Sequence, residues 1–494
     1  MIQKIDRSYA DIEIGDRVCF TRRFPLESFH DFYKLSKDNN PLHHDAHYAS
    51  ATPYQRPILP VLLTSLPLSA IAGTVLPGHR SLFINFQIHA VHPAYYDQEI
   101  SYSAKVIKKN DLFQTITLRT LVFHHSQILL EAEQIIQVRD DVPENLAPAR
   151  DHDIPILRNT PRTVLITGAR GAIGSAIAVN LARNGFNLLL TFRPGACEPD
   201  EHLLSRCRGY GVHVACMAAD LEGDADGLVP LIETMTHDNL ITDLVHVASP
   251  PVHASAHALF NVNYLALKIL SEALIPQILQ RQEGHVLMLG SSAVQSTPQG
   301  WEDYATAKAA ASHYITGLNT RFGHYGLTGW VLAPGMVATQ FSAKFRTPAT
   351  LSLQPEQVAE SASALLKGQY GTQGGYFWLE PQTPERLGRF GFYASEVRSS
   401  LEPDRSAHSS SSVEAVQGAD IDGLFRQFFK LAPSDDIALA RVGESPYWDS
   451  LRHIEFMLFL EKNMGLTFSS KDIDRTKRYL DLVSLIAEKR KSES

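Results

Sequence analysis

Short apolar runs alternate with helical segments through the middle of the chain. The runs at 163–166, 188–190 and 286–289 consist almost entirely of large apolar residues and have the length of buried strands. Stretches with helical character lie between them. Strands that alternate with helices in this way predict a parallel β-sheet that is covered by helices on both faces.

The first 140 residues have a different pattern. A single apolar helical run at 59–72 is followed by strand-like stretches at 81–90, 100–108 and 114–123. These stretches predict a domain in which several β-strands accompany one apolar helix.

Two stretches of linker composition divide the chain. Residues 140–161 contain four prolines and few large apolar residues, and residues 393–418 include four consecutive serines. Three domains are therefore expected, at 1–139, 162–392 and 419–494. A chain of 494 residues has the length for three domains of ordinary size.

Composition narrows the possible environments and partners. With 44% hydrophobic and 20% charged residues the chain has an ordinary globular composition, and it contains no run of eighteen apolar residues that predicts a membrane span. Its N-terminus lacks an apolar signal core. The four cysteines have no paired spacing, so we expect neither a zinc site nor a disulfide framework, and we expect a reducing cytoplasm. The net charge of −8 gives no basic patch for nucleic acid.

A glycine-rich turn follows the first apolar run of the middle domain. Gly168, Gly171 and Gly174 are spaced three apart, with Arg170 and Ile173 between them, and a helical run begins directly afterwards. Glycines let a strand turn tightly into a helix and let backbone N–H groups approach a pyrophosphate. This context favours a dinucleotide-binding turn.

A second group of residues lies far downstream. Tyr304 and Lys308 are four residues apart and therefore share one helix face. Ser291 follows the run at 286–289 and precedes Tyr304 by thirteen residues. Together with the glycine turn, this combination resembles the short-chain dehydrogenase/reductases, and especially the 3-oxoacyl-carrier-protein reductases, over about 163–379.

The resemblance implies a role for each of these residues. Tyr304 would pass a proton to the substrate oxygen, Ser291 would hydrogen-bond the carbonyl group, and Lys308 would lower the pKa of Tyr304 and hold the nicotinamide ribose. Asn263 would anchor a water of the proton relay. Asp220 would lie near the adenine, and a loop would close on the nicotinamide through Pro334, Gly335 and Thr339.

Two positions depart from the family pattern. Ala172 stands where the family has glycine, and residues 246–249 read His-Val-Ala-Ser where the family has Asn-Asn-Ala-Gly. The second change is expected to alter the floor of the cofactor pocket.

The preferred cofactor can be inferred from charge. The second strand ends in Arg193 rather than in an acidic residue, and Arg170 lies in the glycine turn. A guanidinium group facing the ribose suits a 2′-phosphate, which favours NADPH. In the alternative interpretation both arginines are solvated surface residues.

A possible acid–base pair lies in the first domain. Asp38 and His43 flank the turn at Asn40-Pro41, and such a pair can share a proton transfer. Asp38 could equally be a turn residue and His43 an ordinary histidine. The surroundings resemble the MaoC-like (R)-specific enoyl hydratases over about 8–138, which implies a hot-dog fold that wraps a curved antiparallel sheet around one helix.

By this resemblance Asp38 and His43 would remove water from a 3-hydroxyacyl thioester, and Asn40 would support the loop. The sequence departs from the family at Lys37, where glycine is usual, and at Pro60-Val61, where the family has His-Gly before the central helix. The Val61 N–H would still be available to the thioester oxygen, but its side chain would crowd the approach.

The C-terminal domain contains Ser450 at the start of an amphipathic run. A serine at a helix start is accessible to a modifying enzyme. The segment from Asp449 onward resembles the acyl carrier proteins, which implies that a phosphopantetheinyl transferase attaches 4′-phosphopantetheine to Ser450. A bare helical bundle is the alternative. The apolar residues of the run at helical spacing are Leu451, Ile454 and Leu458.

Together these resemblances imply a multidomain chain of α/β and α+β type, with a hot-dog domain, a doubly wound Rossmann-type domain and a helical carrier. The chain would reduce and then dehydrate acyl thioesters in fatty-acid-like or polyketide-like biosynthesis. Ketosynthase and acyltransferase would be separate proteins, and a homo-oligomer is expected. Two alternatives remain: a hot-dog domain that only dimerises or binds acyl chains, and a carrier-bearing scaffold with degenerate catalytic domains.

Overall fold

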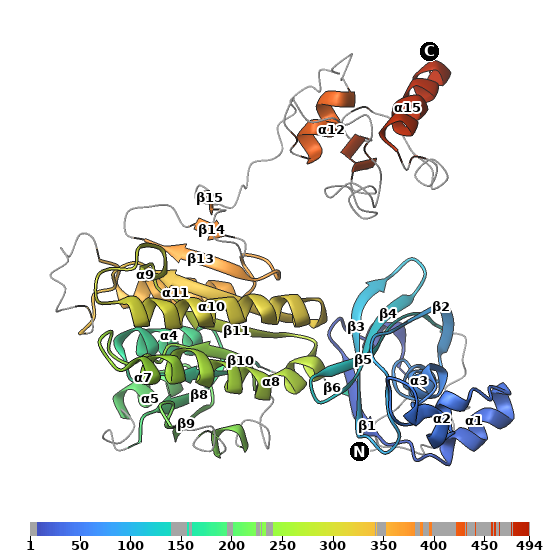
Figure 1. Cartoon of the computed structure of the whole chain (residues 1–494), viewed down its shortest axis with the longest axis horizontal. Helices are drawn as coiled ribbons and strands as arrows, with labels where there is room; N and C mark the ends of the chain where they lie inside the picture. Colours follow the sequence, from blue (N-terminus) through green and yellow to red (C-terminus); the bar gives the residue numbers. More distant parts are fainter. Residues whose placement is uncertain are drawn as a thin grey trace. The chain divides into compact units, whose positions relative to one another are not determined.

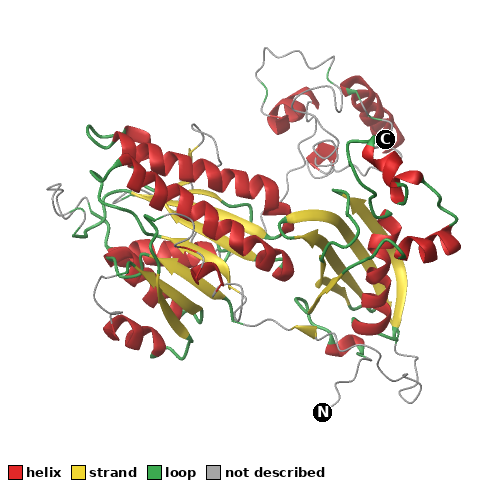
Figure 2. Ribbon diagram, turned by 60° about the horizontal axis from the view of Figure 1, so that its bottom comes forward, coloured by secondary structure: helices red, strands yellow, loops and turns green. Residues whose placement is uncertain are grey.

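The chain forms two compact units, Met1–Leu401 and Glu402–Ser494. The computed structural model describes residues 7–139, 156–157, 161–194, 201–223, 228, 230–233, 241–340, 342, 352–380, 386–388, 395–397, 421–429, 431, 440, 456–457, 459–460, 464, 476 and 478–493. The first unit contains two β-sheets, which Figures 1 and 2 show as separate layers of strands. The predicted domain boundaries at 139, 162, 392 and 419 stay predictions.

The larger sheet has nine strands in the order β15-β14-β13-β12-β11-β10-β7-β8-β9. The seven strands from β9 to β13 are parallel, as the alternating pattern predicted, and β14 and β15 run antiparallel. The chain order reverses between β7 and β10, the position at which such sheets form a ligand crevice. The strands are β7 (Thr163–Thr167), β8 (Asn187–Phe192), β9 (Val214–Ala218), β10 (Ile241–His246), β11 (Gly284–Leu289), β12 (Leu327–Pro334), β13 (Gly375–Leu379), β14 (Arg386–Gly388) and β15 (Ser395–Val397).

Helices cover both faces of this sheet (Figure 2). One face packs against α4 (Ala172–Arg183), α5 (Glu201–Arg208) and α11 (Pro355–Leu366) through a buried apolar cluster. A second cluster on the opposite face involves a π-helical turn η6 (Asn261–Ala266), α8 (Leu267–Arg281) and α10 (Glu302–Phe322). The shorter elements are α7 (Ala256–Phe260), α9 (Ala293–Ser296) and η7 (Gly323–Tyr325).

One helical stretch has the length and composition of a membrane span. Among the described residues, Ala256–Arg281 is apolar enough to cross a bilayer. It is also a core helix here, since Leu267, Leu270 and Leu274 are fully buried in the cluster on the sheet. Its hydrophobicity is therefore accounted for by packing within the fold.

The smaller sheet has six antiparallel strands in the order β2-β5-β4-β3-β1-β6. The predicted apolar run forms α3 (Val61–Ala70) and the π-helical turn η3 (Ile71–Val75), and both pack on one face of the sheet (Figure 1). The strands are β1 (Arg17–Arg22), β2 (Ser81–Ala90), β3 (Ile100–Asn110), β4 (Thr115–His124), β5 (Gln127–Val138) and β6 (Ile156–Leu157), and the remaining helices are η1 (Tyr9–Asp11), α1 (Ser28–Ser36), η2 (Pro41–His43) and α2 (Ala46–Ser50).

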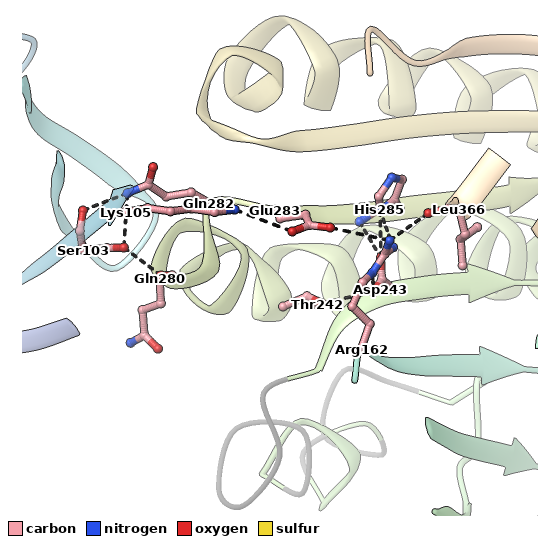
Figure 3. Close-up of polar contacts among 10 residues, drawn as sticks. All are labelled: Ser103, Lys105, Arg162, Thr242, Asp243, Gln280, Gln282, Glu283, His285 and Leu366. Atoms are coloured by element: carbon pink, nitrogen blue, oxygen red, sulfur yellow. Dashed lines mark hydrogen bonds and ion pairs between the residues drawn. The ribbon is translucent and has the colours of Figure 1, made fainter. Parts of the chain in front are cut away.

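The end of α8 and the turn before β11 join the larger domain to the smaller sheet (Figure 3). The Gln280 carbonyl oxygen accepts hydrogen bonds from the Ser103 hydroxyl at 2.7 Å and from the Cys19 thiol at 3.3 Å. The Gln282 amide donates to the carbonyl oxygens of Ser103 and Arg119 at 2.8 and 3.0 Å. Three apolar residues of β4 and β5 also join the buried cluster of α8 and α10: Leu121, Phe123 and Ile128.

A line of charged groups continues from this turn into the larger sheet (Figure 3). The Lys105 ammonium lies 3.6 Å from Glu283, which in turn lies 3.7 Å from Arg162. Arg162 pairs with the fully buried Asp243, whose carboxylate also accepts a hydrogen bond from the His285 ring at 2.9 Å. Burial opposes ionisation of Asp243, but the Arg162 charge and the hydrogen bonds from His285 and Arg162 hold the pKa of Asp243 well below its usual range.

The C-terminal unit has an aromatic core. Helices α12 (Ile421–Phe429) and α15 (Tyr479–Glu493) contribute to it, and the Tyr479 hydroxyl bonds the Asp422 carboxylate. Phe456, Met457 and Leu460 are buried in the same cluster. Asp449, Ser450, Leu451, Ile454 and Leu458 lie outside the residues that the structure describes.

We expect Asp243→Asn to lower the unfolding free energy by about 3–5 kcal/mol at pH 7, because the Arg162 guanidinium loses its nearest buried counter-charge. The Asp243 pKa is lower in the folded chain than in the unfolded one. Its stabilisation is therefore present above about pH 4 and disappears as the pH falls. Urea denaturation at several pH values should show the gap between wild type and variant closing on acidification.

Arg23→Gln is the matched control for this experiment, because Arg23 pairs with Glu99 at 3.2 Å on an exposed surface. Its unfolding free energy should change by less than about 1 kcal/mol. Equal losses of unfolding free energy in Asp243→Asn and Arg23→Gln would show that the buried ion pair stabilises the fold no more than the exposed one.

Candidate active site

A cavity of about 1110 Å³ opens at the carboxyl ends of the parallel strands. Its lining comes from the glycine turn after β7, the end of β8 and the segments that follow β10, β11 and β12. It therefore lies at the reversal of strand order. The predicted residues that line it are Gly168, Arg170, Gly171, Ile173, Gly174, Arg193, Asp220, Ser291, Tyr304, Lys308, Pro334, Gly335 and Thr339.

The glycine turn is shaped by close backbone contacts. Gly168 has a left-handed φ of 67°, and a Cβ there would lie 2.8 Å from the Ala248 backbone. At Gly174 a Cβ would lie 2.2 Å from the Gly168 carbonyl oxygen. At Gly171 the nearest atom would be 3.5 Å away, so this position has room for a methyl group. The first N–H groups of α4 have no partner within the helix, and such a helix start can bind an anion.

Tyr304, Lys308 and Ser291 meet at one wall of the cavity. Lys308 is fully buried, donates to the Leu289 carbonyl oxygen at 2.7 Å, and lies 5.9 Å from the centre of the Tyr304 ring. Trp301 packs edge-on against the Tyr304 ring, with the two ring centroids 5.7 Å apart.

Burial changes the proton affinity of both groups. It raises the pKa of Tyr304, and a hydrogen bond with Ser291 acts in the opposite direction. Burial also lowers the pKa of Lys308 to about 7. The net shift of the Tyr304 pKa is upward, and the expected lowering of this pKa by Lys308 stays a prediction. Burial makes the charged form of Lys308 unfavourable, and it raises the pKa of the Tyr304 phenol.

Asn263 lies in the π-helical turn η6 and is not among the residues that line the cavity. Its amide nitrogen donates to the Leu259 carbonyl oxygen at 2.9 Å. Its Oδ1 atom is buried and accepts no hydrogen bond from the described residues. A buried acceptor of this kind is where a bound water is expected.

The two arginines differ in their surroundings. Arg193 forms an ion pair with Glu222 at 2.9 Å, and its side chain is 67% exposed. Arg170 is exposed at the cavity rim and forms no ion pair with a described residue. Asp220 accepts a hydrogen bond from the Glu222 N–H at 3.0 Å, which orders the turn after β9.

A second pair lies in the smaller domain. The His43 Nε2 atom is 3.9 Å from the Asp38 carboxylate, and His43 Nδ1 is 2.9 Å from the Ile58 carbonyl oxygen. Since a carbonyl can only accept, His43 Nδ1 carries a proton that it donates to Ile58, and Nε2 is the ring nitrogen nearer to Asp38. Asn40 caps the short helix η2 through a hydrogen bond from the Leu42 N–H at 3.0 Å.

The two departures in this domain have visible consequences. Lys37 has a left-handed φ of 61° at the end of α1, a conformation that glycine adopts without strain. Val61 begins α3, so its N–H lies in the first turn, and its side chain is 44% exposed there.

Several residues of the larger site escaped the sequence interpretation. Glu222 pairs with Arg193, Trp301 packs against Tyr304, and His246 is fully buried beneath the glycine turn. His246 was visible as a departure from the family segment. Glu222 and Trp301 carry no motif, and only their place near Asp220 and Tyr304 could have suggested them.

Comparison with known proteins matches this domain to a family. Residues 162–349 match the family model for short chain dehydrogenases. The very-long-chain 3-oxoacyl-CoA reductase of Caenorhabditis briggsae is 29% identical over 198 residues, which cover 37% of this chain and 62% of that protein. The chain thus spans less than two thirds of the length of this relative.

Two further proteins show similarity. The (R)-specific enoyl-CoA hydratase of Aeromonas caviae is 28% identical over 116 residues, which cover 24% of this chain and 87% of that protein. Among solved structures, a short-chain dehydrogenase from Sphingobium yanoikuyae in complex with NADPH is 24% identical, covers 44% of this chain and 87% of that chain, and has a TM-score of 0.39.

The family match, the parallel sheet and the glycine turn agree with one another. Residues 162–349 belong to a short-chain dehydrogenase domain with a Rossmann-type fold. The larger domain of this chain is accordingly an oxidoreductase.

The buried Lys308 predicts a pH-dependent stability. Below pH 7 the lysine is protonated in both the folded and the unfolded chain, and the folded chain bears the full cost of a buried ammonium. As the pH rises from 7 toward 10.5 only the unfolded chain keeps the proton, so stability rises. Lys308→Met should therefore be stabilised relative to wild type near pH 7, and this advantage should shrink as the pH approaches 10.

Thermal midpoints from pH 6.5 to 10 measure this difference. Lys367→Met, at the exposed end of α11, is the control and should differ from wild type by the same amount at every pH. If the difference in thermal midpoint between Lys308→Met and wild type is also independent of pH, the low pKa of Lys308 is contradicted.

Proposed function

We propose that the larger domain reduces 3-oxoacyl thioesters to 3-hydroxyacyl thioesters with NADPH. The observation that carries this proposal is the meeting of Tyr304, Lys308 and Ser291 in the cavity that also contains the glycine turn. The 3-oxoacyl-CoA reductases among the relatives support the class of substrate.

The cavity fits a dinucleotide. Side chains are excluded at Gly168 and Gly174, and the N-terminus of α4 offers free N–H groups to a pyrophosphate. Bound NADPH would supply the hydride. Arg170 is free to face a 2′-phosphate at the rim, whereas Arg193 would first have to leave Glu222. The preference for NADPH is therefore assigned to Arg170.

The protein's own groups would handle the proton. The Tyr304 hydroxyl donates to the developing alkoxide, and Ser291 hydrogen-bonds the same oxygen and orients it. Lys308 lies one helical turn away, where it can hold the ribose hydroxyl groups and return a proton to Tyr304. Asn263 has a free buried acceptor with which to anchor the water that refills this relay.

Tyr304→Phe should lower NADPH oxidation with a 3-oxoacyl thioester by roughly 10²–10⁴-fold, because the proton donor is lost while the ring packing is kept. Absorbance at the nicotinamide band measures the rate. Tyr314→Phe is the matched control, since Tyr314 is on the same helix and outside the cavity lining. Unchanged oxidation in Tyr304→Phe would remove the reductase proposal.

We also propose that the smaller domain is a hot-dog domain that dehydrates the 3-hydroxyacyl product. The sheet that packs on α3 and the Asp38–His43 pair support this proposal, as does the similarity to an (R)-specific enoyl-CoA hydratase. In its neutral form His43 would take the proton next to the thioester carbonyl on Nε2. The same proton would then pass to the hydroxyl group, which leaves as water, while the Asp38 carboxylate stabilises the charged imidazole ring between the two steps.

Asp38→Asn should leave 3-hydroxyacyl thioester accumulating, with enoyl product falling by roughly 10²-fold or more. Product analysis by mass spectrometry separates the two species by the mass of water. Asp31→Asn, on the exposed face of α1, is the control and should leave the products unchanged. Enoyl product at the wild-type level in Asp38→Asn would favour a hot-dog domain that only dimerises or binds acyl chains.

The complete chain is proposed to be a trifunctional β-carbon processing enzyme whose acyl group is attached to phosphopantetheine on Ser450. The aromatic helical core of the C-terminal unit supports a small carrier domain. Separate ketosynthase and acyltransferase proteins would exchange acyl groups with it, in the cytoplasm. A homo-oligomer is supported by the edge strand β2, which exposes four large apolar side chains: Leu82, Phe83, Ile84 and Phe86.

A further inference from the structure

His246 ends β10 and is fully buried between two parts of the reductase site. Its Nε2 atom lies 2.8 Å from the Val262 carbonyl oxygen, and its Nδ1 atom lies 3.0 Å from the Thr167 hydroxyl oxygen. Since the carbonyl can only accept, Nε2 carries the proton and Nδ1 accepts from Thr167. Both nitrogens of the His246 ring thus form hydrogen bonds.

Thr167 connects this ring to the glycine turn. It is the last residue of β7 and directly precedes Gly168. Its hydroxyl oxygen accepts from the N–H groups of Val247 and Ala248 at 3.2 and 3.3 Å. Ala248 is also the residue whose backbone a Cβ at Gly168 would meet, at 2.8 Å. The Thr167 hydroxyl therefore fixes the distance between the glycine turn and the segment after β10.

Val262 connects the same ring to the proton relay. It lies in the π-helical turn η6, next to Asn263. The amide of Asn263 is held by the Leu259 carbonyl oxygen, which leaves its Oδ1 atom available. Any movement of the Val262 carbonyl would displace this acceptor.

We propose that His246 is a positioning residue that ties the glycine turn to the Asn263 turn, and so keeps the bound dinucleotide in register with the proton relay. This inference rests on the reductase function proposed above. Burial and the positive charge of Lys308 lower the pKa of His246 to about 3. The ring therefore stays neutral, and the direction of both hydrogen bonds is constant at physiological pH.

The two hydrogen bonds can be separated by substitution. An asparagine amide places its oxygen near the position of Nδ1, and a glutamine amide extends to the position of Nε2. His246→Asn should therefore keep the bond from Thr167 and lose the bond to Val262. His246→Gln should keep the Val262 bond and lose the Thr167 bond. Asparagine is also the residue that the resembled family has at this position.

Two different defects are expected in the full-length chain. His246→Gln should weaken NADPH binding roughly 10-fold with kcat little changed, because the glycine turn loses its support. His246→Asn should bind NADPH within about 2-fold of wild type but lose roughly 10-fold in kcat, because the Asn263 turn is freed. Hydrogen–deuterium exchange should rise at 259–266 in His246→Asn only.

His285→Gln is the control, because His285 is also a buried histidine of this sheet but bonds Asp243 at the opposite ends of the strands. It should lower the thermal midpoint without altering the NADPH Kd or kcat. Equal losses of Kd and kcat in both His246 variants, or no local change in exchange, would overturn the inference.

A failure of the proposed reductase function can be distinguished from a failure of this inference about His246. Absence of NADPH turnover in wild type would remove the reductase proposal, while hydrogen exchange in the two variants would still show whether His246 holds the Asn263 turn.

Discussion

The buried pair of Arg162 and Asp243 is the interaction on which the first unit depends. It fastens together the amino ends of β7, β10 and β11, the three strands whose opposite ends carry the glycine turn, His246 and Ser291. Through Glu283 and Lys105 the same charges extend to the smaller sheet. An ion pair withdrawn from water is costly unless its geometry is satisfied, so this arrangement tolerates little displacement. The strands that carry the site are thus held together at the far side of the sheet.

At the carboxyl ends of the strands, burial determines the chemistry. Desolvation raises the pKa of Tyr304 and lowers that of Lys308, so both groups are biased toward their neutral forms. A neutral phenol keeps the proton that a developing alkoxide requires, and a lysine that titrates near pH 7 can give up or regain one easily. Ser291 opposes the shift of Tyr304 by hydrogen bonding. The site therefore combines a buried proton donor, Tyr304, with a nearby lysine, Lys308, whose charge changes near pH 7.

Much of this arrangement was predictable from the sequence. The apolar runs located β7, β8 and β11 to within two residues, because a fully buried strand must be apolar along its whole length. The spacing of Tyr304 and Lys308 placed both on α10 for the same geometric reason. The Arg193–Glu222 pair and the low pKa of Lys308 were not predictable, since periodicity records which residues are buried and not which partners they meet. The junction at Gln282 has no sequence motif either, because its partners in β3 and β4 are more than 160 positions away.

The junction at Gln280 and Gln282 has one further consequence. The oxidoreductase cavity and the Asp38–His43 pair belong to a single compact unit, and hydrogen bonds, charges and apolar side chains all cross the boundary between their two sheets. Hinge motion cannot bring the two places together without breaking these contacts. The distance between the cavity and the Asp38–His43 pair is therefore fixed. Any tether that serves both places must be long enough to span that distance.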